Sequence, residues 1–164
     1  MKLGKVSTKG KDYSAKDVLV LEELDGVRAR PQMYIGSVDA DGLFQLLKEI
    51  ADNGADEGLA GRNDFVGVHI ADDGLTVTVW DRGGGIPVEK HPKTGRSTII
   101  DIFTRMHAGG KFGSKAYDQG SKGVHGVGAS VTNALSESFT VWTCRSNQWY
   151  SVRFAKGKVK GGVS

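Results

Sequence analysis

The chain has 164 residues, of which 24 are glycine, 3 are proline and 1 is cysteine. Glycine is about twice as frequent as its usual ~7%, but the absence of a Gly-X-Y period excludes a collagen-like chain. The contents of hydrophobic residues (38%) and charged residues (25%) are ordinary for a globular domain, which excludes a disordered chain. The net charge of +3 is too small to indicate a nucleic-acid-binding protein by itself.

Residues 1–14 are polar and rich in Lys and Gly, which predicts a flexible N-terminal arm before a single domain at residues 15–164. Hydrophobic periodicity and turn residues then predict alternating elements. Helices are expected at 16–30, 42–60, 97–106 and 127–135, and strands at 65–70, 75–81, 138–144 and 149–155. Helices that precede mostly antiparallel strands favour an α+β fold with the helices on one face of a sheet.

Two turns support the strand predictions. Asp72-Asp73-Gly74 is a hairpin signature between the first two strands, and Ser146-Asn147 joins the last two. Basic residues gather near both ends of the chain, at Lys2, Lys5, Lys9, Lys11, Lys156, Lys158 and Lys160. Such groups are typical either of solvated termini or of contacts to phosphate.

Cysteine usage and hydropathy bear on the cellular compartment. Cys144 stands alone, so no internal disulfide can form, which is typical of a reducing environment. No apolar run approaches the ~20 residues of a membrane span, and residues 1–20 lack the apolar core of a signal peptide. We therefore expect a cytoplasmic protein with no membrane contact.

The helix predicted at residues 42–60 carries polar side chains beside its core face. The core stripe is formed by Leu43, Leu47, Ile50 and Gly54, whereas Asp52 and Asp56 lie further round and are expected to be more exposed. Glu49, Asn53 and Glu57 follow at intervals of four residues along one edge of that stripe, where Glu49 and Asn53 would be half-buried. This pattern is typical either of a solvated acidic face or of a hard cation such as Mg²⁺ beside a water-activating carboxylate.

Asp81 ends the strand predicted at residues 75–81 and shares a face with Val77 and Val79. It would either cap a turn or form the floor of a pocket that accepts a ligand N–H group. The following Arg82-Gly83-Gly84-Gly85-Ile86-Pro87 segment is almost bare backbone, which suits the close approach of a flat ligand.

A second glycine-rich stretch runs from His107 to Gly128 and leads into the helix predicted at 127–135. Glycine loops that run into a helix offer backbone N–H groups to phosphate, although a surface loop has the same composition. Neither G-x-x-x-x-G-K-[ST] nor G-x-G-x-x-G between a strand and a helix is present, so the common nucleotide motifs do not apply.

Together these segments resemble the GHKL ATPases, and within them the ATPase domain in the B-type subunits of bacterial or phage type II DNA topoisomerases (gyrase and topoisomerase IV). The resemblance runs from Tyr13 to about Phe154, and its most distinctive parts are residues 26–36 and 107–112. It implies the Bergerat fold, a two-layer sandwich with a mixed, mostly antiparallel sheet. It also implies ATP and Mg²⁺ as ligands.

The resemblance implies a role for each matching residue. Glu49 matches the general base, and Gln45 stands one turn earlier, where gyrase has a histidine that orients the base. Asn53 matches the Mg²⁺ ligand. Asp81 matches the residue that accepts a hydrogen bond from the adenine amino group. Gly85, Ile86 and Pro87 would lie beside adenine, and Glu57 and Arg145 resemble a pair at the pocket mouth. Tyr13 falls in an arm that reaches a partner's nucleotide. The ATP lid and its phosphate loop are matched by Lys111, Tyr117, Gly123, Val124, His125, Gly126, Val127 and Gly128.

Several residues depart from the family pattern. Gly84 occupies the arginine position of Asp-x-Gly-Arg-Gly-Ile-Pro and cannot make that arginine's pairing with Glu57. Gln45 can donate a hydrogen bond but cannot titrate, and Lys122 replaces a glycine and adds a possible phosphate contact. The lid also looks one residue longer than usual. These changes fit a divergent or phage-type member.

The resemblance implies a domain that dimerises through its arm on ATP binding and couples hydrolysis to DNA strand passage. An A-type topoisomerase subunit and DNA would be its partners in the full enzyme, and aminocoumarin-type inhibitors would bind at the ATP site. We expect the domain to be partial, without the transducer domain. The alternative is a nucleotide-binding regulatory or decoy module without turnover, which Gly84 motivates. A mismatch-repair or chaperone ATPase is disfavoured by residues 26–36 and 107–112.

Overall fold

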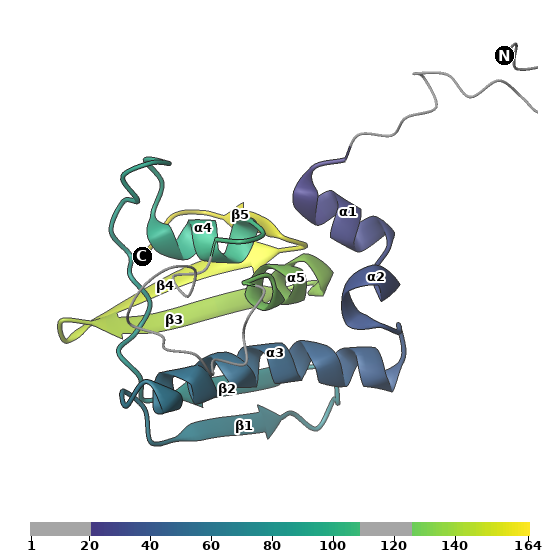
Figure 1. Ribbon diagram of the computed structural model, residues 1–164, viewed down its shortest axis with the longest axis horizontal. Helices are drawn as coiled ribbons and strands as arrows, with labels where there is room; N and C mark the ends of the chain where they lie inside the picture. The colour runs from purple at the N-terminus through teal and green to yellow at the C-terminus, as the bar shows by residue number, and fades with distance from the viewer. Residues whose placement is uncertain (1–20, 109–125) are drawn as a thin grey trace, which may run out of the picture.

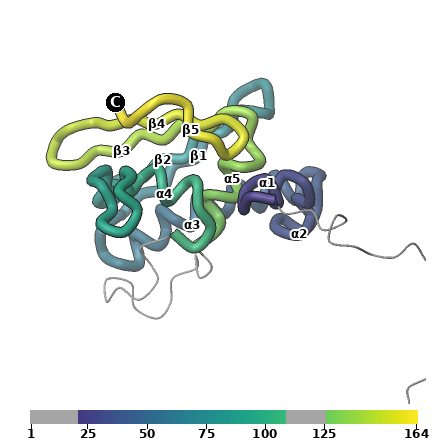
Figure 2. The backbone as a smooth tube through the Cα atoms, turned by 90° about the horizontal axis from the view of Figure 1, so that it is seen from above, coloured from purple at the N-terminus to yellow at the C-terminus, as the bar shows by residue number. Residues whose placement is uncertain are grey.

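The computed structural model describes residues 21–108 and 126–164. Figures 1 and 2 show strands gathered in one layer with α3, α4 and α5 on one side of it. The elements, in chain order, are α1 (Glu23–Ala29), α2 (Gln32–Ile35), α3 (Ala40–Leu59), β1 (Val66–Ile70), β2 (Val77–Asp81), α4 (Thr98–Thr104), α5 (Gly128–Leu135), β3 (Phe139–Arg145), β4 (Gln148–Ala155) and β5 (Lys158–Lys160). This arrangement confirms the predicted α+β class.

The described strands form two antiparallel sheets, β1–β2 and β3–β4–β5. The β1–β2 turn is held by Asp73, whose carboxylate accepts the backbone N–H groups of Leu75 and Thr76, both at 2.8 Å. These hydrogen bonds lower the pKa of Asp73. Ser146 and Asn147 join β3 to β4 with φ values of 51° and 61°, as two-residue hairpin turns require.

The strand β5 was not predicted. It is three residues long and its outward side chains are lysines, so it lacks the length and the hydrophobic alternation by which strands are found. The Lys156-Gly157 turn before it has positive φ at both residues, 52° and 80°. This turn returns the chain along β4, with Ala155 opposite Lys158 and Arg153 opposite Lys160.

The first helical segment ends where the sequence predicted, because α1 stops at Ala29, two residues before Pro31. The short helix α2 follows and was not anticipated. Two predictions for α3 were wrong. Leu43, assigned to the core stripe, is 61% exposed, and Asp56, expected to be more exposed, is buried.

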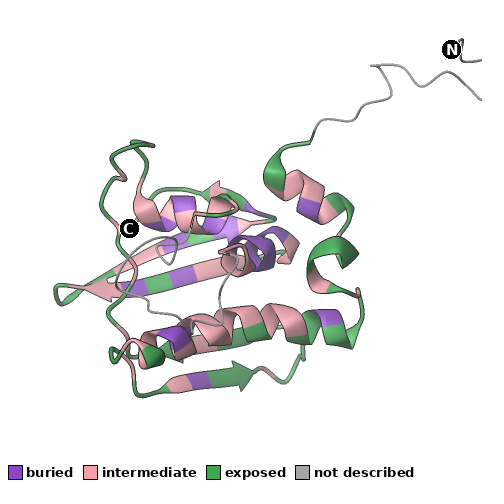
Figure 3. Ribbon diagram, viewed as in Figure 1, coloured by how far each residue is buried: buried purple, intermediate pink, exposed green. Residues whose placement is uncertain are grey.

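Two groups of buried side chains form the core. One lies between α4 and the inner face of β3 and β4 and consists of Ile99, Phe103, Val141, Val152 and Phe154. The other lies between α1 and α5 and consists of Val27, Val131 and Ala134. Figure 3 shows that α5 is buried along most of its length. The fully buried Asn133 of α5 donates to the carbonyl oxygen of Phe103 at 2.7 Å, which joins the two groups.

In the described ranges, no helix has both the length and the hydropathy to cross a membrane.

Candidate functional site

The half-buried edge of α3 holds three side chains at one-turn spacing. Gln45 donates from Nε2 to Oε1 of Glu49 at 2.8 Å, which fixes one oxygen of that carboxylate. Asn53 donates from Nδ2 to the backbone carbonyl oxygen of Glu49 at 3.0 Å. An amide nitrogen has no acceptor lone pair, so the carbonyl oxygen is the atom of this side chain that could bind a cation. The prediction that Glu49 and Asn53 are half-buried is confirmed.

The other oxygen of Glu49 lies against the first residue of α5. A Cβ atom added to Gly128 would stand 2.0 Å from Oε2 of Glu49, which is closer than real Cβ contacts allow. The carboxylate thus sits beside the N-terminus of α5, where backbone N–H groups carry partial positive charge. Only a glycine at this position admits the carboxylate so close to the helix backbone.

Asp81 stands at the end of β2, opposite Val66 of β1. A Cβ added to Gly54 of α3 would lie 2.9 Å from Val66 and 3.3 Å from Asp81, so this pair faces the helix. Oδ1 of Asp81 accepts the backbone N–H of Gly83 at 2.7 Å. The aspartate therefore caps a turn, one of the two alternatives left open by the sequence, and its second oxygen does not take part in that turn.

The bare segment after Asp81 runs against β3. Gly85 has a φ of 74°, and a Cβ there would stand 2.3 Å from the carbonyl oxygen of Cys144. The backbone N–H of Ile86 donates to Oγ1 of Thr143 at 2.7 Å, and the Ile86 side chain packs on the core under β3. Pro87 is exposed. The hydrogen bond from Ile86 to Thr143 connects the loop after β2 to the second sheet.

Glu57 and Arg145, which the resemblance places as a pair at the pocket mouth, have different hydrogen-bond partners in the structure. Arg145 donates from Nη1 to the carbonyl oxygen of Gly84 at 2.9 Å. Glu57 instead forms a two-point ion pair with Arg62, at 2.8 Å to Nε and 3.0 Å to Nη2. The physical reason is reach, because Arg62 follows in the turn after α3 and presents both guanidinium donors to the carboxylate.

Sequence reasoning missed Arg62, which lies in this region. Its Cδ atom lies 3.9 Å from the position that a Cβ on Gly84 would take. Glu57 in turn lies beside Gly83, whose Cβ would meet Cγ of Glu57 at 3.1 Å. A guanidinium group is thus present next to the bare loop although the loop's own arginine position is a glycine. The available signal was the basic residue five positions after Glu57, at the end of the helix.

Of the predicted loop residues, Gly126, Val127 and Gly128 are described. Val127 precedes α5 and packs on the group formed by α1 and α5. The remaining predicted ligand-binding residues lie outside the described residues, namely Tyr13, Lys111, Tyr117, Gly123, Val124 and His125. The structure therefore brings together the α3 edge, the end of β2, the following loop and the start of α5.

Comparisons with known proteins agree with this geometry. The family model described as histidine kinase-, DNA gyrase B- and HSP90-like ATPase matches residues 38–159. The DNA gyrase B protein of Mycoplasma genitalium is 48% identical over 158 residues, which are 96% of this chain and 24% of that protein. The B-type subunit of DNA topoisomerase 4 from Bartonella bacilliformis is 45% identical over 152 residues, 92% of this chain and 22% of that protein.

A solved structure is also similar. The 43K ATPase domain of Thermus thermophilus gyrase B, in complex with an aminocoumarin, superposes with a TM-score of 0.72 at 38% identity, and the match covers 86% of this chain and 34% of that one. The chain spans about a quarter of the length of the curated relatives that it matches.

Proposed function

The chain belongs to the histidine kinase-, DNA gyrase B- and HSP90-like ATPases, and on that premise we propose that it binds and hydrolyses ATP as the ATPase domain of a type II DNA topoisomerase of the gyrase B kind. The observation that carries the proposal is the position of Glu49. One oxygen of its carboxylate accepts from Gln45, and the other lies at the start of α5.

Hydrolysis needs a base that is held in place next to the phosphates. The N-terminus of a helix attracts phosphate through its unpaired N–H groups and its dipole. A carboxylate fixed beside that terminus is within reach of a water molecule that attacks a terminal phosphate. In the proposed mechanism Glu49 accepts the proton of this water, and Gln45 keeps the carboxylate oriented. The loop that precedes α5, with Gly123, Val124, His125, Gly126, Val127 and Gly128, would surround the phosphates together with Lys111 and Tyr117.

The adenine would lie at the end of β2. Asp81 would accept a hydrogen bond from the adenine amino group through the oxygen that does not cap the turn. The plane of the base would lie on the bare segment of Gly85, Ile86 and Pro87. Arg145, held by the Gly84 carbonyl, and Glu57, held by Arg62, would flank the opening. A side chain at Gly85 would force this segment away from β3.

Asn53 would hold Mg²⁺, which neutralises the charge of the phosphates. The described residues contain no cluster of three or more His, Cys, Asp or Glu that could hold a metal alone. Mg²⁺ in nucleotide sites characteristically takes one or two protein ligands and completes its shell with phosphate oxygens and water. A single amide oxygen one turn from Glu49 meets that requirement.

The assembly belongs to the same proposal. ATP would close two copies through the arm of residues 1–14, with Tyr13 reaching the partner, and residues 15–164 would form the nucleotide-binding unit. In the full enzyme the partners would be an A-type subunit and DNA, in the cytoplasm. An aminocoumarin would compete with ATP at the same site.

Calorimetry with a non-hydrolysable ATP analogue and Mg²⁺ tests the proposal. The wild-type chain should bind. Asp81→Asn should bind at least about tenfold more weakly, because its amide keeps one oxygen for the turn but presents N–H donors to the adenine amino group. Asp72→Asn, an exposed aspartate in the β1–β2 hairpin, is the matched control. No binding by the wild type would overturn the function, and equal binding by the two variants would overturn the role of Asp81.

A further inference from the structure

The sheet β3–β4–β5 has one face on the core and one face that no element among the described residues covers. Alternation along the strands places Val141, Thr143, Val152 and Phe154 inward, where all four are buried. The register then fixes the outward set, since residues opposite each other in a pair share a face. We call this outward set the open sheet face, and it consists of Thr140, Trp142, Cys144, Trp149, Ser151, Arg153, Ala155, Lys158 and Lys160.

Two tryptophans stand on the open sheet face. Trp142 is 64% exposed and Trp149 is 70% exposed. Trp142 lies opposite Ser151 and Trp149 lies opposite Cys144, so the two indoles are diagonal neighbours across β3 and β4. Large aromatic side chains so placed offer flat surfaces to a ligand.

The charges on this sheet have one sign. The three strands, FTVWTCR, QWYSVRFA and KVK, contain four basic residues and no aspartate or glutamate. Three of these cations, Arg153, Lys158 and Lys160, lie on the open sheet face. Arg153 and Lys160 are directly opposite each other, a like-charge pair that destabilises a sheet unless an anion lies between the two groups.

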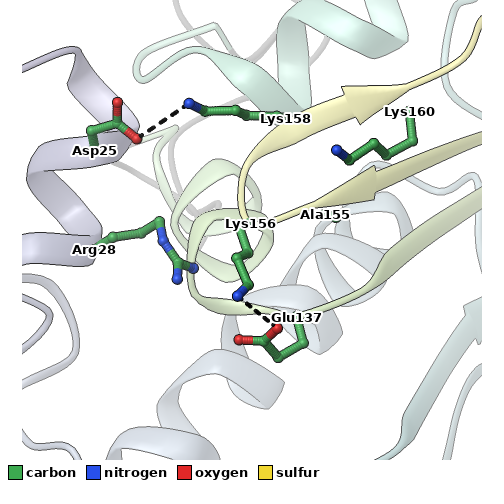
Figure 4. A pocket seen from close by; sticks show the side chains of 7 residues that line it. All are labelled: Asp25, Arg28, Glu137, Ala155, Lys156, Lys158 and Lys160. Carbon is green, nitrogen blue, oxygen red and sulfur yellow. Dashed lines mark ion pairs between the residues drawn. The ribbon is translucent and has the colours of Figure 1, made fainter.

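The positive charge continues around the edge of the sheet. A cavity of about 470 Å³ is lined by Lys156, Lys158 and Lys160 and, from α1, by Arg28. Figure 4 shows how these side chains lie. Two carboxylates are present there. Glu137 pairs with Lys156 at 3.0 Å and Asp25 with Lys158 at 3.9 Å. Cations therefore outnumber carboxylates in this cavity.

We propose that the open sheet face binds single-stranded DNA, with bases stacked on Trp142 and Trp149 and phosphates held by Arg153, Lys158 and Lys160. Exposed aromatic rings with interspersed cations on a sheet are the chemistry that single-stranded nucleic acids require. Paired bases in a duplex hide the surfaces on which an indole stacks. The choice of DNA over RNA rests on the proposed function.

This surface is separate from the candidate ATP site. Figure 2 shows α3, α4 and α5 on the side of the strand layer away from it. The residues of the candidate site lie on α3, at the end of β2, in the loop after it and at the start of α5. Arg145 of β3 also belongs to the site, and alternation places it on the opposite face of the sheet from Trp142 and Cys144. Changes on the open sheet face should therefore leave nucleotide binding unaffected.

Fluorescence anisotropy with labelled oligo(dT) tests the proposal on this chain. Trp142→Ala/Trp149→Ala should weaken binding at least about thirtyfold, because each of the two stacked bases contributes ~1–3 kcal/mol. Phe44→Ala, which removes an exposed aromatic ring on α3, is the aromatic control. Lys158→Gln/Lys160→Gln should reduce the slope of log affinity against log salt by about 1.4, the value for two phosphate contacts. Lys48→Gln/Lys93→Gln removes the same charge elsewhere.

Each contrary result would overturn a particular part of the proposal. Equal binding by the tryptophan variants and wild type overturns the stacking surface, and tighter binding of duplex DNA or of oligo(U) overturns the assignment to single-stranded DNA. Thermal denaturation shows that each variant is folded. Calorimetry with the ATP analogue separates the two proposals. If the analogue binds and oligo(dT) does not, only the proposal for the open sheet face is overturned. If oligo(dT) binds and the analogue does not, the proposed function is overturned, and the comparison with oligo(U) alone then decides between DNA and RNA.

Discussion

Gly128 controls where the carboxylate of Glu49 lies. Replacing it with alanine would put a Cβ 2.0 Å from Oε2 and 2.9 Å from Cβ of Glu49, so the side chain must leave its position beside α5. We expect Gly128→Ala to lower the rate of ATP hydrolysis about tenfold or more, as a misplaced base does. Affinity for the ATP analogue should fall much less. Steady-state phosphate release and calorimetry measure the two effects.

Gly26 provides the matched control for this substitution. It also lies in a helix, but a Cβ there meets nothing within 4 Å. Gly26→Ala should leave hydrolysis unchanged and raise stability by about 0.5–1 kcal/mol, because alanine restricts the unfolded chain. If Gly128→Ala hydrolyses ATP at the wild-type rate, Glu49 does not act from its position beside α5.

Arg62 is positioned to compensate for the missing side chain at Gly84. Its guanidinium holds Glu57 at two points, and its stem fills the space next to Gly84. Arg62→Ala should weaken binding of the ATP analogue about two- to fivefold, the range of a partly exposed ion pair. Adding Gly84→Arg to this variant should restore binding, because the new arginine enters the vacated space.

Two comparisons make this prediction specific. Gly84→Arg alone should not improve binding, since Arg62 already occupies that space. Arg82→Ala removes a neighbouring guanidinium that lies over the Phe65 ring at 4.9 Å, and it should have no effect on affinity. Calorimetry on wild type, the two single variants and the double variant forms a double-mutant cycle. Failure of the second arginine to restore binding would show that the two positions are not equivalent.

At the scale of elements, the start of α3 depends on Asp39. Its carboxylate accepts from the Ser37 hydroxyl at 2.6 Å and from the backbone N–H of Asp41 at 3.0 Å, and these hydrogen bonds lower its pKa. A lowered pKa in the folded state adds stability above the unfolded value of 3.8, and this contribution disappears as pH falls through the folded pKa.

We therefore expect Asp39→Ala to lower the melting temperature at neutral pH and to differ less from wild type below about pH 4. Asp39→Asn should keep most of the cap, because asparagine is an equally good N-cap residue, but it should remove this acid dependence. Asp64→Asn changes an exposed carboxylate outside any helix and controls for net charge. A constant difference between Asp39→Ala and wild type at all pH values would contradict the prediction.

Periodicity and turn chemistry located these elements well, because both act within a few residues. The end of α1 before Pro31 and the hairpin at Asp73 follow from local sterics and hydrogen bonds. Burial that depends on long-range packing was predicted less well. Asp56 was placed on the exposed side of α3 by the helical wheel, yet it is buried, because neighbouring elements cover more of the helix than its apolar stripe indicates.

The same distinction between local and long-range interactions applies to the candidate site. The sequence could place Glu49, Asn53 and Asp81 near one another from their spacing and from resemblance, since each occupies a fixed position on a regular element. The ion pair of Glu57 with Arg62 was not anticipated, because it depends on a turn whose geometry the sequence does not reveal. The open sheet face was also missed, because the register that groups Arg153 with Lys160 requires β5 to be known.

At the scale of the whole molecule, the candidate site joins two sheets that share no strand pairing among the described residues. Asp81 belongs to β1–β2, whereas Thr143 and Arg145 belong to β3–β4–β5. Near the site, the two parts are connected by the hydrogen bonds of Ile86 to Thr143 and of Arg145 to Gly84. A nucleotide held by both parts would therefore stabilise the molecule as one unit.

Thr143→Val tests this linkage. The valine has nearly the same shape but cannot accept from Ile86, so unfolding by urea should show a loss of about 1–3 kcal/mol. The wild type should gain about 2.7 kcal/mol from the ATP analogue at a hundred times its Kd, and Thr143→Val should gain less at the same concentration because the segment beside adenine is no longer fixed. Thr140→Val, on the open side of the same strand, should match wild type in both measurements. An unchanged gain in Thr143→Val would mean that the nucleotide does not depend on the contact between the sheets.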